Sequence, residues 1–209
     1  MKCYIGIDLG STTTKAVLMD EDDNVLGRGI TNSRSNYDTA STVAKQEAII
    51  DTRLTLLRRN LAGLSALEGG LDDVLGVLER SFRHQQFLEQ LGDLRETCRA
   101  QLDAERFADT RRTLEAVLEA LFGRIEEESA ALFAPGAARK SDFFRDIAGS
   151  RYMTIGEELA KEAELGFDLL LNLYDKAIIE VENRPPDGNL KETFLRGLES
   201  AGRKEDLAD

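Results

Sequence analysis

The residues best suited to chemistry in this sequence lie within its first fifteen positions. A carboxylate ends an apolar run, and a glycine, three hydroxyl residues and an ammonium group follow it; these residues are Asp8, Gly10, Ser11, Thr12, Thr13 and Lys15. Such a turn can point backbone N–H groups and hydroxyls into one concavity that suits phosphate oxygens, and glycine permits a close approach of the backbone. Lys15 would add a positive charge. Asp8 could hold magnesium through its water shell, because Mg²⁺ keeps most of its waters. The stretch predicts a phosphate-binding turn.

Two common nucleotide-binding signatures are absent from the sequence. It contains neither G-x-x-x-x-G-K-[ST] nor G-x-G-x-x-G. The alternative interpretation of the same stretch is a β-hairpin with a Ser/Thr-rich turn and one solvated aspartate. The carboxylate and the ammonium group that bracket the hydroxyl residues favour the phosphate-binding interpretation, since hydroxyl-rich turns rarely carry both.

Short, partly β-branched segments surround this turn. "CYIGID", "TKAVLM" and "NVLGRGIT" have strand character, and the turn-forming residues "DEDDN" join the second to the third. Residues 3–31 therefore predict a three-stranded antiparallel meander. Because side chains alternate along a strand, Thr14 is expected on the other face of the strand from its neighbour Lys15, and its replacement by alanine is expected to cost much less than changes at Asp8 or Lys15.

The periodicity becomes helical after the meander. Asp38 is a plausible N-cap, and residues 107–125 and 166–183 carry apolar side chains at i, i+3 and i+4. Breaks rich in Gly or Pro fall at 65–70, 134–140 and 184–189. The predicted fold class is α/β, with a β-meander domain at 1–40 and a helical insertion or interaction region at 41–209.

Composition excludes several classes of protein. The formal net charge of −12 argues against nucleic acid or an anionic membrane as partner. Cys3 and Cys98 are too far apart for a CxxC metal site, and a single histidine, His84, cannot build a multi-histidine zinc site. Asp8 interrupts the first apolar run, so no signal peptide is expected, and no stretch reaches the ~18 apolar residues of a membrane span. A cytoplasmic protein is predicted.

The quoted residues also resemble a known family. "GIDLGSTTTKAVLMD" looks like the first phosphate-binding hairpin of the superfamily of actin, sugar kinases and heat-shock chaperones, and within it is most similar to the ATP-hydrolysing activators of 2-hydroxyacyl-CoA dehydratases and benzoyl-CoA reductases. "GRGITNSRSNYDTAS" and "GAARKSDFFRDIAGSRY" resemble the larger, A-type ATP-binding subunit of benzoyl-CoA reductases. The meander would then be part of a ribonuclease-H-like, actin-like ATPase domain.

The resemblance implies a role for each candidate residue. Asp8 would be the carboxylate on the magnesium side, Gly10 to Thr13 the phosphate cradle, and Lys15 the cation at the phosphates. ATP hydrolysis would drive electrons from ferredoxin through a [4Fe–4S] cluster, shared with a second ATPase subunit, to aryl-CoA-reducing subunits that dearomatise benzoyl-CoA in anaerobic aromatic degradation.

Parts that the family fold requires are missing from this sequence. They are a second phosphate hairpin of the type D-x-G-G, an adenosine-binding Gly-Gly turn, and cluster cysteines. Asp146 and Gly149 imitate the second hairpin with a spacing one residue too long, and a helix end is expected there. "ALEGGLDD" is expected to be a loop between helices. The chain is therefore predicted to be the N-terminal half of the ATPase, with the cluster ligated outside it and no activity by itself.

Other interpretations of the sequence remain open. A non-catalytic helical interaction protein with a vestigial nucleotide-binding hairpin is the main alternative, and a fragment of a sugar kinase or an actin-like filament protein is a third. His84 is expected on a helix surface. A basic-aromatic cluster is expected either to be a loop-to-helix corner with paired arginines or to dock a partner subunit; its members are Arg139, Lys140, Phe143, Phe144, Arg145, Arg151 and Tyr152.

Overall fold

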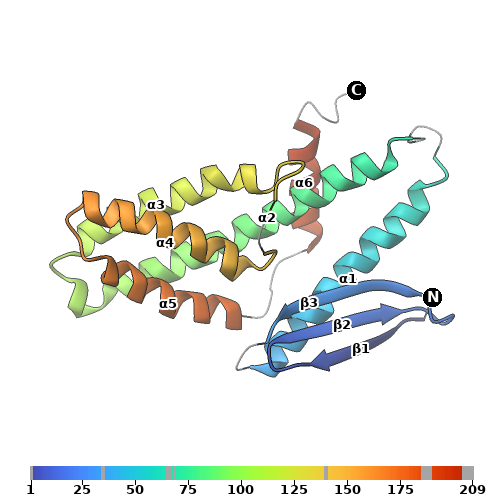
Figure 1. The fold of residues 1–209 in the computed structure, drawn as a ribbon, viewed down its shortest axis with the longest axis horizontal. Coiled ribbons are helices and arrows are strands. Elements are labelled where there is room, and N and C mark those ends of the chain that lie inside the picture. The colour runs from blue at the N-terminus through green and yellow to red at the C-terminus, as the bar shows by residue number, and fades with distance from the viewer. Residues whose placement is uncertain are drawn as a thin grey trace. The chain divides into compact units, whose positions relative to one another are not determined.

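The computed structural model of the chain is shown in Figure 1. The structure describes residues 2–33, 36–64, 67, 69–138, 141–184 and 190–203. These contain three strands and six α-helices. The contacts divide most of them into two compact units, the first formed by the chain up to Glu79 and the second by Arg80–Glu182 with the last helix.

The first unit contains the predicted meander. Its strands are β1 (Tyr4–Leu9), β2 (Thr13–Met19) and β3 (Val25–Asn32), which pair antiparallel in the order β1-β2-β3. In the β2–β3 turn the Asp20 carboxylate accepts hydrogen bonds from the backbone N–H groups of Asp22 and Asn24. Asp23 takes a positive φ of 60° there, which is tolerated by aspartate in turns. The three-stranded α/β fold predicted from the sequence is confirmed.

Helix α1 (Tyr37–Leu61) crosses one face of the sheet and packs on β2 and β3 (Figure 1). The side chains at this contact are small: Ala16 on β2 meets Ala44 and Ala48 on α1. On β3 the facing residue is Gly29, where an added Cβ would overlap the Ala44 carbonyl oxygen and lie 2.5 Å from the Ala48 nitrogen. The helix can therefore approach the strand closely only because neither surface carries bulk there.

Strand β1 is held differently from the other two strands. All six of its residues are exposed, whereas α1 buries Thr14 and Ala16 on β2 and Gly29 and Thr31 on β3. Within the described residues β1 pairs only with β2. The position of each β1 side chain is thus set by the hydrogen-bonded register with β2 and not by a core around it.

The N-terminus of α1 differs from the expectation. The N-cap is Asn36, whose side-chain oxygen accepts hydrogen bonds from the N–H groups of Asp38 (3.0 Å) and Thr39 (3.2 Å). The Asp38 prediction was wrong by two positions, because Asn is as good a capping residue as Asp. Asp38 lies instead in the first turn, where its charge suits the helix dipole.

The second unit is a set of packed helices. Its elements are α2 (Leu71–Ala100), which begins in the first unit, α3 (Arg111–Leu132), α4 (Phe144–Glu162), α5 (Phe167–Asn183) and α6 (Leu190–Arg203). The apolar residues of α3 that were predicted to face the protein core are all buried: Leu114, Val117, Leu118, Leu121, Phe122 and Ile125. In α5 the same holds for Leu170, Tyr174, Ile178 and Val181, whereas Phe167 and Leu171, predicted on the same face, are only half-buried. The helical periodicity therefore predicted the core of α3 fully and that of α5 in four of six positions.

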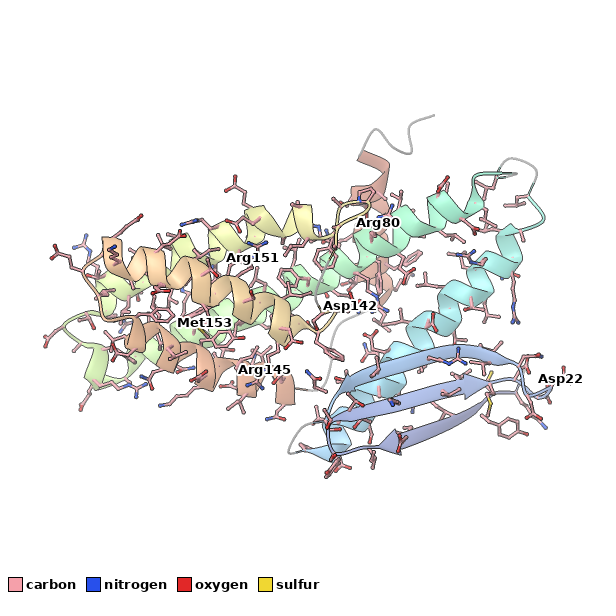
Figure 2. All side chains as sticks on the ribbon, in the orientation of Figure 1. Asp22, Arg80, Asp142, Arg145, Arg151 and Met153 are labelled. Carbon is pink, nitrogen blue, oxygen red and sulfur yellow. The ribbon has the colours of Figure 1, made fainter. Side chains whose placement is uncertain are left out.

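The arginines in the described part of the basic-aromatic cluster form ion pairs with glutamates of neighbouring helices. Figure 2 labels Arg145 and Arg151 on α4; Arg145 pairs with Glu182 at 2.9 Å and Arg151 with Glu128 at 3.2 Å. Tyr152 is buried and donates a hydrogen bond to the Leu170 carbonyl oxygen. These contacts favour the corner interpretation over a docking surface. Arg139 and Lys140 lie outside the described residues.

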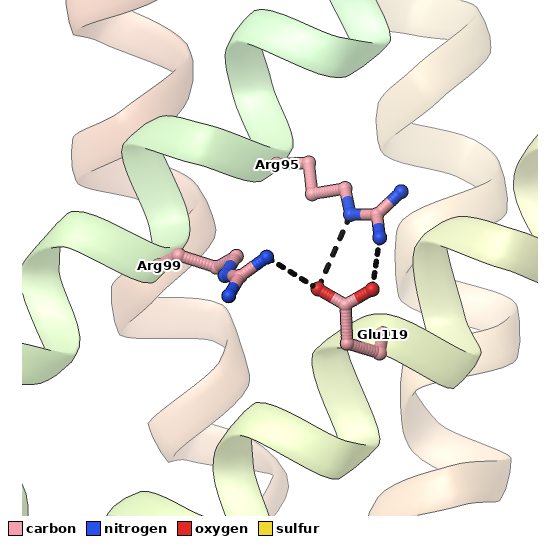
Figure 3. A network of polar contacts seen from close by, with 3 residues as sticks. All are labelled: Arg95, Arg99 and Glu119. Atoms are coloured by element: carbon pink, nitrogen blue, oxygen red, sulfur yellow. Dashed lines mark hydrogen bonds and ion pairs between the residues drawn. The ribbon is translucent and has the colours of Figure 1, made fainter.

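A second polar network joins α2 to α3 (Figure 3). Glu119 accepts from the Arg95 Nε at 3.2 Å and pairs with Arg99 at 3.1 Å. All three side chains are at least a third exposed, so each pair contributes at most about 1 kcal/mol. The network orients the two helices more than it stabilises them.

His84 does not lie on an open helix surface as expected. Its Nε2 is 2.7 Å from the Ser129 Oγ, and its ring stacks on Phe133 with centroids 5.1 Å apart. The histidine is therefore a contact between α2 and α3. Helical spacing could not show this, because the partner lies 45 positions away in the sequence.

The predicted division of domains at residue 40 falls close to the change from strands to helices, since α1 begins at Tyr37. The compact units group α1 with the sheet. That 1–40 and 41–209 have separate functions stays a prediction. Among the described helices, none combines the length and the apolar character that a membrane span requires.

Candidate phosphate-binding site

The strand register brings the two predicted charged residues together. Asp8 on β1 is directly opposite Lys15 on β2, and residues opposite each other in an antiparallel pair share one face of the sheet. This face is the one away from α1, because Thr14 and Ala16, the neighbours of Lys15, are buried against the helix. Both charged side chains are exposed, and neither forms an ion pair with another described residue. Both side chains are therefore open to solvent on one face of the sheet.

The turn next to this pair offers backbone donors. Gly10, Ser11 and Thr12 connect the strands, and the Gly10 N–H donates to the Thr13 carbonyl oxygen at 3.2 Å. No described residue accepts a hydrogen bond from the N–H of Ser11 or Thr12. These donors can bind an anion, and the exposed hydroxyls of the same two residues add to them.

Gly10 is required for a reason other than its dihedral freedom. Among the described residues, positive φ occurs only at Asp23, Glu164, Gly69 and Gly136, so the turn has no left-handed residue. A Cβ on Gly10 would instead lie 2.5 Å from the Thr13 carbonyl oxygen, which is closer than real contacts allow. Glycine lets the two sides of the turn close on each other.

Sequence reasoning missed Ser33, which follows β3 and holds this turn. Its Oγ donates to the Gly10 carbonyl oxygen at 2.5 Å, and its N–H donates to the Thr12 carbonyl oxygen at 2.8 Å. The Thr14 Oγ1 is 3.1 Å from the Ser33 Oγ. Thr14 lies on the face opposite Lys15, as expected. Its side chain is fully buried and hydrogen-bonded to Ser33, so a substitution at this position is not expected to be neutral. A hydroxyl placed just after a strand was the available signal in the sequence.

The residues present fit a magnesium-bound phosphate group. The turn supplies neutral donors, Lys15 a cation and Asp8 a carboxylate. Among the described residues no three His, Cys, Asp or Glu side chains gather into a metal site, so Asp8 stands alone. A single carboxylate together with substrate phosphates is the usual way in which proteins hold Mg²⁺, whose remaining ligands are waters.

Comparison with known protein families identifies the family to which the chain belongs. Residues 5–160, more than half of the 209-residue chain, match the family model described as the BadF/BadG/BcrA/BcrD ATPase family. The chain belongs to this ATPase family. Members are ATPases that activate benzoyl-CoA reductases and 2-hydroxyacyl-CoA dehydratases. Neither the curated proteins nor the solved structures gave a match.

Family membership confirms the resemblance at the level of the family and implies that the nucleotide is ATP. The matched range contains the whole hairpin and α1. The assignment to the A-type subunit of benzoyl-CoA reductase is finer than the match and stays a prediction, as do the roles of Asp8, Lys15 and the residues between them.

In this chain the segment that imitates a second phosphate hairpin is helical. Asp146 and Gly149 lie in the first two turns of α4, not at the helix end that was expected. The Asp146 carboxylate accepts from Ser141, and a Cβ on Gly149 would lie 2.6 Å from the Tyr174 hydroxyl. Gly149 therefore serves helix packing. The other candidate, Gly69 and Gly70, precedes α2 as a loop; residues 65, 66 and 68 lie outside the description.

The two cysteines have different environments. Cys3 is exposed before β1, whereas Cys98 is buried in the core of the helical unit. Burial raises the pKa of the Cys98 thiol to about 12, because the core disfavours the charged thiolate. Metal ligation requires the thiolate, so Cys98 is poorly suited to hold a cluster.

This difference predicts selective alkylation of the native protein. At pH 8 about one in ten thousand Cys98 thiols would be ionised, and the core also blocks the reagent. Iodoacetamide should modify Cys3 and leave Cys98 intact until guanidinium chloride unfolds the helices, as peptide mass spectrometry can measure. Equal modification of both thiols in the native state would contradict the burial and the raised pKa of Cys98.

Proposed function

We propose that this chain is the ATP-binding component of an ATP-driven, iron–sulfur-dependent electron activator that feeds a benzoyl-CoA, or related aryl-CoA, reductase. Family membership supports the ATPase part of this proposal. The observation that carries the site is the pairing of Asp8 with Lys15 across β1 and β2, next to a turn with unused N–H donors. The three sequence stretches that resemble the A-type subunit support the finer assignment.

Each residue of the hairpin has a role in this proposal. The N–H groups and hydroxyls between Gly10 and Thr13 cradle the phosphate oxygens, and Lys15 neutralises charge that grows on them during phosphoryl transfer. Asp8 orients the waters around Mg²⁺. Magnesium supplies charge neutralisation at the phosphates when bound; this chain contributes the fixed positions around it.

The proposed partners follow from the same resemblance. They are a second ATPase subunit, the aryl-CoA-reducing subunits, and ferredoxin as electron donor, all in the cytoplasm. The [4Fe–4S] cluster of the assembly would be ligated outside this chain, a proposal supported by the buried state of Cys98. The helical unit would provide surfaces for these contacts.

One observation favours the alternative function, a non-catalytic interaction protein with a vestigial hairpin. The segment nearest to a second phosphate motif is part of helix α4, so the described residues would contact bound phosphates from one side only. Phosphoryl transfer depends on positioning and charge stabilisation from several sides. The two functions differ in whether the chain binds nucleotide at all.

The proposed function predicts binding of ATP without turnover by the 209-residue chain. Calorimetric titration should show weak, magnesium-dependent binding, with a Kd on the order of 1 mM, and AMP should bind less well because it lacks the terminal phosphates. Phosphate release should stay at the rate of a blank without protein. Absence of magnesium-dependent binding would favour the vestigial alternative, and steady turnover would contradict the one-sided site.

A further inference from the structure

Ser33 is joined to the turn between β1 and β2 through both its side chain and its backbone. The Ser33 Oγ donates to the Gly10 carbonyl oxygen, and the Ser33 N–H donates to the Thr12 carbonyl oxygen. The residue lies 23 positions after Gly10 and directly after β3. Its half-buried side chain contacts Thr14, on the face of the sheet opposite Asp8 and Lys15. Ser33 therefore acts on the turn and not on a ligand.

These two bonds fix the orientation of two peptide groups. In a planar trans peptide the C=O and the following N–H point in opposite directions. Holding the Gly10 carbonyl toward Ser33 consequently turns the Ser11 N–H away from Ser33. Holding the Thr12 carbonyl does the same for the Thr13 N–H. The Ser11 N–H is one of the donors that no described residue uses.

The Ser33 hydroxyl is itself oriented by a buried neighbour. Ser33 uses its single hydroxyl hydrogen in the bond to Gly10, so in the 3.1 Å contact between the two hydroxyls Thr14 is the donor. Thr14 is fully buried against α1, and its position on β2 is fixed by pairing with Leu9 and Thr31. The turn is thereby tied to the buried contact between the sheet and α1.

We propose that Ser33 is a positioning residue of the phosphate-binding turn, which closes the turn through the Thr12 carbonyl and holds the Gly10–Ser11 peptide so that the Ser11 N–H faces the phosphates of the nucleotide. This inference rests on the proposed function of the hairpin. Without the Ser33 hydroxyl the Gly10–Ser11 peptide is free to rotate, and the turn must be ordered at the moment of binding. The loss appears in affinity for the nucleotide.

The test compares Mg-ATP binding by variants of the full 209-residue chain, followed by NMR titration, with folding checked by circular dichroism. Ser33→Ala should raise the Kd about tenfold, the usual effect of one lost hydrogen bond to a binding group. Ser33→Thr keeps the hydroxyl and should restore the affinity to within about twofold. Thr14→Val removes only the bond that orients Ser33 and should have a smaller effect in the same direction. Thr42→Ala removes a hydroxyl that bonds the Asp38 carbonyl on α1 and should leave the Kd unchanged.

The outcomes separate this proposal from the function on which it rests. If Asp8→Asn weakens binding while Ser33→Ala binds like the wild type, or if Ser33→Thr fails to restore binding, the role of Ser33 is wrong and the site stands. If neither Asp8→Asn nor Ser33→Ala changes the Kd, or the wild type does not bind Mg-ATP, both proposals are wrong. A purely structural serine would lower the melting temperature and leave the Kd unchanged.

Discussion

Replacement of Gly29 by alanine is expected to destabilise the sheet and α1 by about 3 kcal/mol or more, at the upper end of overpacking effects. The added Cβ would overlap the Ala44 carbonyl oxygen and crowd the Ala48 nitrogen. Both are backbone atoms of α1, so the clash cannot be relieved by a side-chain rotation. The helix must move away from β3, and the small core around Ala16, Ala44 and Ala48 opens.

Gly6→Ala is the matched control for this change. Gly6 also lies in a strand of the same sheet, but nothing lies within 4 Å of a Cβ added there. Alanine at this position should be neutral or slightly stabilising, because glycine loses more conformational freedom on folding. Amide hydrogen exchange in β2 and β3 reports the local free energy of opening. Equal protection in the two variants would show that the close contact between α1 and β3 is wrong.

Asp8→Asn and Lys15→Ala are each expected to lower the ATPase activity of the assembled activator by about a hundredfold or more, as the loss of other preorganised electrostatic groups does. Asp8→Asn keeps the shape of the side chain and removes the charge that orients the magnesium waters. Lys15→Ala removes a cation next to charge that develops in the transition state. Under the proposed function, ATP-dependent reduction of the aryl-CoA should fall in parallel, because ATP hydrolysis would drive the electron transfer.

Two surface residues provide controls with the same change of charge. Asp22 is an exposed carboxylate at the end of the sheet opposite the phosphate-binding turn (Figure 2), and Lys45 is exposed on α1. Asp22→Asn and Lys45→Ala should retain full activity. If all four variants lost activity to a similar, small extent with Mg-ATP affinity unaltered, the hairpin would be a structural element only.

The sequence predicted those parts of the structure that depend on local periodicity. The short, β-branched segments predicted the meander, whereas the register that sets Asp8 opposite Lys15 was found only in the structure. The spacing of Leu114, Leu118 and Ile125 gave the buried side of α3. In β2 and α3 the pattern of residues along the chain coincides with the pattern of burial, because side chains of a strand face the core at every second residue and those of a helix at every third or fourth. β1 is exposed along its whole length.

Features that depend on partners distant in sequence could not be predicted in this way. Asp146 and Gly149 suggested a helix end, yet Gly149 lies within α4, where a glycine is needed because the Tyr174 hydroxyl occupies the space of a side chain. The role of Ser33 depends on Gly10, 23 positions earlier. The close approach of α1 to β3 requires small residues on two elements at once. Each of these features depends on a tertiary contact, which the sequence pattern of a single strand or helix does not contain.

Binding of the nucleotide at the turn between β1 and β2 can be tested residue by residue. Amide ¹H–¹⁵N spectra of the 209-residue chain, recorded during titration with Mg-ATP and with ATP in excess EDTA, would locate the nucleotide. The account predicts that the largest magnesium-dependent shifts occur at Gly10, Ser11 and Thr12, with smaller shifts at Asp8 and Lys15 and none in the buried part of α3. Shifts confined to the helices, or no shifts between residues 8 and 15 at saturating Mg-ATP, would contradict it.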